Sequence, residues 1–136
     1  GLHVHVPLNA SDDFDTVRGF ARQASEVLAA REPDSLTVEQ RKDSRNDRVY
    51  SDVMRNAYAQ TAVAPYSVRA RRGAPVATPL AWAELEDPGL TPHQFTLRTM
   101  ADRLDRLGGA DPWAGMARRR YSLARASQRL AKLGGV

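Results

Sequence analysis

Apolar and polar residues alternate along three stretches of the chain, which is the pattern of half-buried β-strands. The stretches cover residues 1–8, 48–52 and 61–71. In the first of them, His3 and His5 share the polar face, opposite a row of leucine and valine side chains. Because domains rarely begin inside a strand that carries polar site residues, this start indicates a fragment or one product of a longer chain.

Helical spacing of apolar residues marks most of the remainder. It predicts helices over about 13–31, over about 97–107 and over about 112–133, with shorter helical segments within 37–45 and 80–85. Taken together, the strands and helices indicate an α+β fold for the single domain or fragment of residues 1–136. We expect a mostly antiparallel sheet with helices packed on one face.

Composition narrows the class of protein. The chain has 136 residues, enough for one domain with a modest core. It has no cysteine, which excludes disulfides and thiolate metal sites. The formal net charge of +4 favours anionic partners, nucleic acid first. No run of residues is long and apolar enough for a membrane span, so we expect no membrane partner and a cytoplasmic location.

Asp52 is the strongest candidate for site chemistry. It lies on the polar face of its expected strand, close in sequence to Arg45, Arg48 and Arg55. Carboxylate oxygens suit Mg²⁺ and Mn²⁺, and guanidinium groups suit phosphate. The alternative is a surface aspartate paired with a nearby arginine.

If the three strands share a sheet, one face brings together imidazole, carboxylate and guanidinium groups. The residues on that face are His3, His5, Asp52, Ser67, Arg69 and Arg71. Such a set suits a metal-bound polyphosphate. Each residue type also has an alternative interpretation. The two histidines could be a pair of metal ligands or simply half-exposed side chains. The two arginines, Arg69 and Arg71, could form ion pairs with surface carboxylates.

The last expected helix is strongly basic. After Asp111 it has no acidic residue, and it carries Arg118, Arg119, Arg120, Arg125, Arg129 and Lys132. It is either a solvated surface or a contact for nucleic-acid phosphates.

Three segments resemble one family, the polymerase domain of bacterial DNA ligase D in the archaeo-eukaryotic primase superfamily. They are GLHVHVPL at 1–8, RNDRVYSDVMRN at 45–56 and TAVAPYSVRARRGAPVATPLAW at 61–82. The resemblance extends to Trp113. It implies that this chain corresponds to the C-terminal portion of a primase-polymerase fold.

This resemblance implies a nucleotide-binding part of a polymerase that adds nucleotides, often ribonucleotides, to DNA ends in bacterial non-homologous end joining. It implies Mn²⁺ or Mg²⁺ as the cofactor of the complete domain. The partners implied are a nucleoside triphosphate, DNA ends, and ligase and end-binding proteins that are fused or separate. Asp52 matches the third catalytic, metal-binding aspartate, and His3 matches a histidine that contacts phosphate. Arg45 and Arg69 match basic residues of the nucleotide pocket, and Arg71 lies on the same face as Arg69.

The chain also departs from the family. The Asp-x-Asp motif of the family precedes the histidine motif, and this chain starts at the histidine motif. We therefore expect the isolated chain to bind the catalytic ions poorly and to be inactive alone, since carboxylates are what hold such ions. The alternative is a non-catalytic remnant that binds nucleotides or nucleic acid. Asp47 stands where the family usually has glycine in a turn, and aspartate tolerates such turns.

Overall fold

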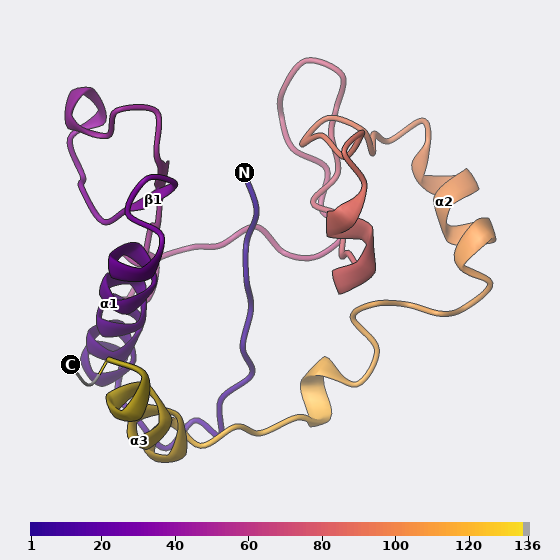
Figure 1. Cartoon of the computed structure of the whole chain (residues 1–136). Helices are drawn as coiled ribbons and strands as arrows, with labels where there is room; N and C mark the ends of the chain where they lie inside the picture. Colours follow the sequence, from indigo (N-terminus) through magenta and orange to yellow (C-terminus); the bar gives the residue numbers. More distant parts are fainter. Residues whose placement is uncertain (135–136) are drawn as a thin grey trace. The chain divides into compact units, whose positions relative to one another are not determined.

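The computed structural model describes residues 1–134, which form two compact units (Figure 1). The first unit consists of Gly1–Val6 and Ala62–Arg119. The second unit consists of Pro7–Thr61 together with the residues that follow Arg119. No helix among the described residues is long and apolar enough to cross a membrane.

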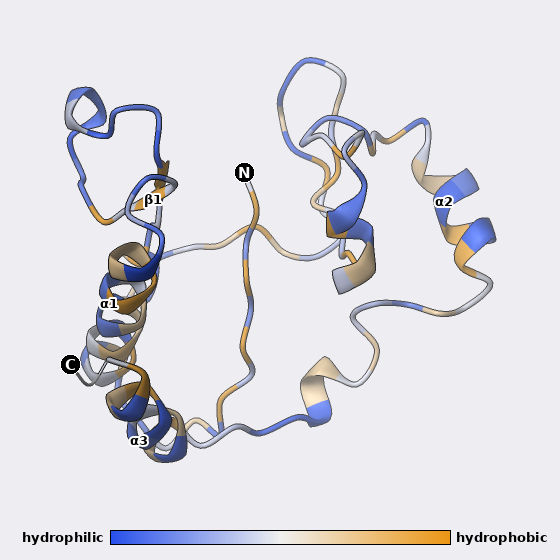
Figure 2. Cartoon of the chain, viewed as in Figure 1, coloured by the Kyte–Doolittle hydropathy of each residue, from blue (hydrophilic) through white to orange (hydrophobic). Residues whose placement is uncertain are grey.

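Two helices organise the second unit. Helix α1 (Phe14–Arg31) begins where the Asp13 carboxylate accepts a hydrogen bond of 2.7 Å from the backbone N–H of Thr16. Helix α3 (Leu123–Gly134) packs against α1, and its first residue, Leu123, is only 3% exposed. Figure 2 shows that both helices carry apolar residues on one side and polar residues on the other. The helix expected over 13–31 is confirmed.

The sheet is small and lies in the second unit. Strand β1 (Leu36–Thr37) pairs in parallel with strand β2 (Val49–Tyr50), and the 3₁₀-helix η1 (Lys42–Ser44) lies in the loop between them. The expectation of a mostly antiparallel sheet is therefore wrong: the only sheet in residues 1–134 has two parallel strands.

In the first unit, short segments pair without forming regular strands. Single antiparallel bridges join Val68 to Val76 and Pro75 to Thr96. Around them lie the 3₁₀-helix η2 (Trp82–Glu86), helix α2 (Met100–Leu107) and the 3₁₀-helix η3 (Met116–Arg118), so that the short helical segment expected within 80–85 is confirmed. Helix α2 ends at Gly108, whose φ of 54° is the left-handed conformation that glycine favours.

The stretch 61–71 fails as a strand for local reasons. Tyr66 follows Pro65 and adopts a φ of 62°, which interrupts an extended backbone. Opposite Arg69, Pro75 has no N–H to donate to a ladder. These residues thus make one tight hairpin, held by a 2.8 Å hydrogen bond from the backbone N–H of Arg69 to the carbonyl of Pro75.

The stretch 1–8 fails for a different reason. Leu2, Val4 and Val6 do alternate in sequence, but they are 57%, 65% and 59% exposed. Within residues 1–134, the backbone of Gly1–Val6 makes no backbone hydrogen bond. A strand needs a neighbouring backbone, and the alternating pattern cannot supply one.

The last helix is shorter than expected. The stretch predicted to be helical over 112–133 becomes helical as α3 only at Leu123. Gly115 adopts a φ of 79°, which ends any regular helix before that point. As a result Arg118 lies in η3, whereas Arg119 and Arg120 lie between η3 and α3.

Candidate functional site

The first unit contains a hollow of about 440 Å³, lined largely by aliphatic residues and prolines, with basic and aromatic side chains among them. His3, His5 and Arg69 line it together with Trp82 and Trp113. Of the polar residues expected to share one face, the two histidines and Arg69 are therefore brought to one place. A hollow with cationic and aromatic walls suits a ligand that has an anionic end and a flat ring.

The two histidines differ in their surroundings. The rings of His5 and Trp113 form a T-shaped pair with centroids 5.2 Å apart, and the centroid of the His3 ring is 6.1 Å from that of His5. Partial burial, and then the neighbouring charge of His3, lower the pKa of His5 below its usual value. His5 is thus biased toward the neutral imidazole.

Arg69 owes its position to the hairpin. Its guanidinium has no carboxylate within ion-pair distance among residues 1–134, so the alternative of a surface ion pair is not what the structure shows. Arg71 lies in the turn of the same hairpin, where its N–H donates to the carbonyl of Arg69 at 2.8 Å. Arg71 is exposed and does not line the hollow.

A buried ion pair supports one wall of the hollow. Arg103, only 5% exposed, reaches from α2 to the two carboxylate oxygens of Glu84 in η2, at 2.7 and 3.1 Å. It also donates to the carbonyl of Pro79 at 2.9 Å and lies 4.2 Å from the centroid of the Phe95 ring. These contacts fix η2, and with it Trp82, at the hollow.

Sequence analysis did not identify Arg103, although a signal was present. Arg103 follows Met100 by three residues and precedes Leu107 by four, so that it lies on the apolar face of α2. A charged residue at such a position must find a partner when the face is buried. Glu84 is that partner, and the hydrogen bond from Arg103 lowers the pKa of its carboxyl group.

A second side-chain hydrogen bond joins distant segments of the first unit. The Tyr66 hydroxyl donates to the Asp111 carboxylate, which also accepts from the N–H of Trp113 at 2.9 Å. Burial, and then the bond to Asp111, raise the pKa of Tyr66 to about 12. The hairpin and the Trp113 segment are thereby joined across the sequence.

Arg45 lies in the second unit and is engaged by its own loop. Its guanidinium donates to the carbonyls of Glu39 and Gln40 at 3.1 and 2.7 Å, and it lies 4.2 Å from the centroid of the Tyr50 ring. The loop turns at Asn46 and Asp47, whose φ angles are 49° and 61°. The turn anticipated at Asp47 is therefore present.

Asp52 follows β2 in the second unit and is exposed. It accepts a hydrogen bond of 3.0 Å from the N–H of Met54 and has no ion pair with an arginine in the described part of the chain. In that same part, no group of three or more histidine, aspartate or glutamate residues is placed to hold a metal ion. Asp52 thus offers one carboxylate, which is not by itself a site for a hard divalent ion.

The geometric premise of the sequence-based site is wrong. That premise placed His3, Asp52 and Arg69 on one face of a shared sheet, and residues 1–134 contain no such sheet. His3 and Arg69 belong to the first unit, whereas Arg45 and Asp52 belong to the second.

The basic residues after Asp111 do not all lie on one helix. Of these, Arg118, Arg119 and Arg120 precede α3, and Arg125 is exposed on it.

Comparison with known proteins gives consistent matches. The family model described as the primase-polymerase domain of LigD matches residues 1–113. The multifunctional non-homologous end joining protein LigD of Pseudomonas aeruginosa is 37% identical over 129 residues, which are 95% of this chain and 15% of that protein. The protein of the same name from Mycolicibacterium smegmatis is 35% identical over 79% of this chain and 14% of its own length.

The bifunctional non-homologous end joining protein LigD of Bacillus subtilis is 30% identical over 109 residues, which are 79% of this chain and 18% of that protein. The chain therefore spans less than a fifth of the length of these relatives. The resemblance drawn from the three sequence segments is confirmed, and the chain belongs to the family of LigD primase-polymerase domains.

Proposed function

We propose that this chain is the nucleotide-binding part of a primase-like polymerase that adds nucleotides to DNA ends during non-homologous end joining. The observation that carries the proposal is the basic and aromatic hollow of the first unit, where His3 and Arg69 meet two tryptophans. The names of the relatives support the repair role. The DNA end is the proposed partner, together with a fused or separate ligase.

The chemistry of the hollow fits one part of a nucleoside triphosphate. His3 and Arg69 offer N–H donors to phosphate oxygens, and a guanidinium without a carboxylate partner is free to form charge-assisted bonds. Trp82 and Trp113 offer aromatic surface for a base or a sugar. The same proposal assigns phosphate contacts to Arg45 and Arg71.

We propose Mn²⁺ or Mg²⁺ as the cofactor of the complete domain, with Asp52 as one ligand. Such an ion would neutralise phosphate charge at the reacting phosphorus. The described residues do not supply a full ligand set, so no step of the reaction is assigned to the isolated chain. This observation also favours a second candidate, a non-catalytic domain that binds nucleotide or nucleic acid. Nucleotide addition by the isolated chain with Mn²⁺ would reject that candidate.

Arg69→Ala is expected to weaken nucleotide binding. The lost hydrogen bond to a charged phosphate oxygen corresponds to about 1.5–3 kcal/mol, or roughly 10- to 150-fold in Kd. Titration of a nucleoside triphosphate against both proteins measures the difference. Arg72→Ala is the matched control, because Arg72 is exposed, lies in the turn of the same hairpin and does not line the hollow. Equal affinity of wild type and Arg69→Ala would reject the proposed site.

The basic face of α3 gives a separate expectation for DNA. Arg125 and Arg129 are exposed on this helix, and if both contact phosphates, replacing both with glutamine should flatten the salt dependence by up to about 0.9 per contact. Binding of a DNA end across a salt series measures the slope. If the slope and the affinity do not change, the helix is a solvated surface.

A further inference from the structure

A hydrogen-bonded pair of serines adjoins Asp52 in the second unit. Ser25, on α1, is only 6% exposed, and its Oγ lies 2.8 Å from the Oγ of Ser51. Ser51 follows β2, immediately precedes Asp52 and is half-buried. The bond therefore joins the middle of α1 to the residue next to the proposed catalytic carboxylate. We call Ser25 and Ser51 the serine pair.

The direction of the bond follows from the protons that the two hydroxyl groups can offer. A serine hydroxyl has one proton to donate. Ser25 Oγ donates its proton to the carbonyl of Ala21, four residues earlier on α1, at 2.9 Å. The Ser51 hydroxyl is therefore the donor within the serine pair, and Ser25 Oγ accepts. Removal of the Ser25 hydroxyl would leave the Ser51 hydroxyl without this acceptor.

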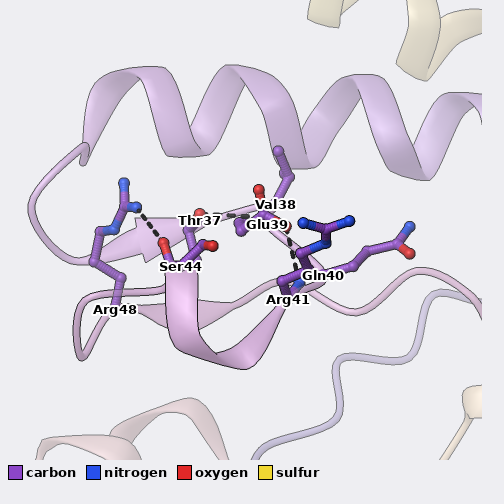
Figure 3. Close-up of a pocket in the computed structure, with 7 residues that line it drawn as sticks. All are labelled: Thr37, Val38, Glu39, Gln40, Arg41, Ser44 and Arg48. Atoms are coloured by element: carbon purple, nitrogen blue, oxygen red, sulfur yellow. Dashed lines mark hydrogen bonds between the residues drawn. The ribbon is translucent and has the colours of Figure 1, made fainter.

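The sheet holds Ser51 from a second direction. Its backbone N–H donates to the carbonyl of Thr37 in β1 at 2.9 Å, which continues the parallel pairing one residue beyond β2. Thr37 is only 5% exposed, and it also lines a hollow of about 550 Å³ at the loop that joins β1 to β2 (Figure 3). Because β1 packs against α1, the helix and the sheet fix Ser51 together.

The orientation of Asp52 depends on that of Ser51. Successive side chains of an extended backbone point to opposite sides, so the Asp52 carboxylate points away from α1 when the Ser51 hydroxyl faces it. Asp52 is exposed, and its Oδ1 accepts from the N–H of Met54 at 3.0 Å. Within the described part of the chain, Oδ2 of Asp52 has no hydrogen bond and no ion pair. This oxygen is open to a ligand.

We propose that Ser25 is a positioning residue for Asp52 and that it acts through Ser51. The serine pair holds the backbone just before Asp52 against α1 and thereby fixes the direction of the carboxylate. Such precision matters, since a displacement of about 1 Å at a reacting group can cost about 10²-fold in rate. The inference rests on the proposed function in giving Asp52 a role in nucleotide addition. It assigns no contact with the nucleotide to either serine.

Ser25→Ala is the first variant, because alanine suits a helix interior and the change removes only the hydroxyl. In the complete polymerase domain it should lower kcat for primer extension about tenfold, a fraction of the cost of a full displacement. The KM for the nucleoside triphosphate should change by less than about twofold, since ground-state binding is not affected. A kcat equal to that of wild type, or a loss confined to KM, would overturn the inference.

Ser127→Ala is the matched control. Ser127, on α3, also donates to the carbonyl four residues earlier, that of Leu123, at 3.0 Å. It thus has the same bond within its helix as Ser25, but it has no bond to Ser51. Its kcat should equal that of wild type. An equal fall of kcat in Ser127→Ala and Ser25→Ala would show a general effect of losing a helix hydroxyl and would overturn the inference.

Variants of Ser51 test whether the two serines act as one unit. Ser51→Ala should lower kcat as much as Ser25→Ala does, and the double variant should be no slower, because each change removes the same bond. Ser51→Thr keeps the hydroxyl and should recover most of the rate that Ser51→Ala loses. Losses that multiply in the double variant, or no recovery with threonine, would overturn the inference.

Amide hydrogen exchange measures the positioning without catalysis. The N–H groups of Ser51 and Met54 flank Asp52 and donate to Thr37 and to the Asp52 carboxylate. Both should exchange about fivefold faster in Ser25→Ala, which is the usual effect of one lost hydrogen bond, and neither should change in Ser127→Ala. Exchange at the rate of wild type in Ser25→Ala would overturn the inference.

Asp52→Ala in the same domain separates this inference from the proposed function. If Asp52→Ala retains extension, the role of Asp52 is rejected and the inference falls with it. If Asp52→Ala is inactive while Ser25→Ala has the kcat of wild type, the inference alone is rejected.

Discussion

Asp52→Ala in the complete polymerase domain is expected to abolish nucleotide addition. If Asp52 is one of the carboxylates that hold Mn²⁺ or Mg²⁺, its loss leaves the charge of the triphosphate poorly neutralised when the phosphoryl bond changes. Loss of a group that neutralises such charge costs about 10³-fold or more in rate. Primer extension on a DNA end with Mn²⁺ measures the effect.

Two further variants separate the metal role from a structural one. Asp52→Asn keeps an oxygen that can accept from the N–H of Met54, so the local turn survives while the charge is lost. It should be nearly as inactive as Asp52→Ala. Asp47→Asn is the control, because it removes a nearby carboxylate. Asp47 has a φ of 61°, a conformation that asparagine also tolerates. The Asp47→Asn variant should therefore remain active. Near-normal extension by Asp52→Asn would reject the role.

Glu84→Gln is expected to have the largest effect on stability. The change removes the negative charge and one of the two acceptor oxygens at Glu84, so the buried charge of Arg103 keeps only neutral partners, which are an amide oxygen, the Pro79 carbonyl and the Phe95 ring. Breaking a buried ion pair by removing one partner costs about 3–5 kcal/mol, and the partial exposure of Glu84 places this pair near the lower end of that range. Urea unfolding measures the free energy of unfolding.

The matched control is Glu86→Gln, an exposed carboxylate of the same 3₁₀-helix, which should change the free energy of unfolding by less than about 0.5 kcal/mol. Replacing both Glu84 and Arg103 with apolar residues should recover part of the loss, since no unpaired charge then remains. If Glu84→Gln lowers the free energy of unfolding by less than Glu86→Gln does, the pair does not stabilise the first unit.

The same pair predicts a dependence on pH. Arg103 lowers the pKa of Glu84 below its ordinary value of 4.5, so the folded state binds fewer protons there than the unfolded state. The stability contributed by this carboxylate is present above about pH 4.5 and is lost as the pH falls through the lowered pKa. The acid loss of stability should therefore be smaller in Glu84→Gln than in wild type.

The helices were predictable because their signals are local. The Asp13 carboxylate caps the first turn of α1, and the glycine at position 108 ends α2, each within a few residues of the helix that it bounds. The expectation failed for the last helix because Gly115 adopts a left-handed φ that apolar spacing does not reveal. The family was also readable from the sequence, since its motifs consist of adjacent residues.

Strands and the site depended on partners that lie far away in sequence. The alternation in residues 1–8 showed which side chains share a face, but a strand exists only where another backbone accepts and donates its hydrogen bonds. Likewise, residue type suggested His3 and Arg69, whereas only the tertiary structure placed them in one hollow and left Arg45 and Asp52 in another unit. Arg103 and Glu84 are the clearest case. The sequence determined a charge on an apolar helix face, and the fold decided its partner, because burial makes an unpaired charge too costly to leave alone.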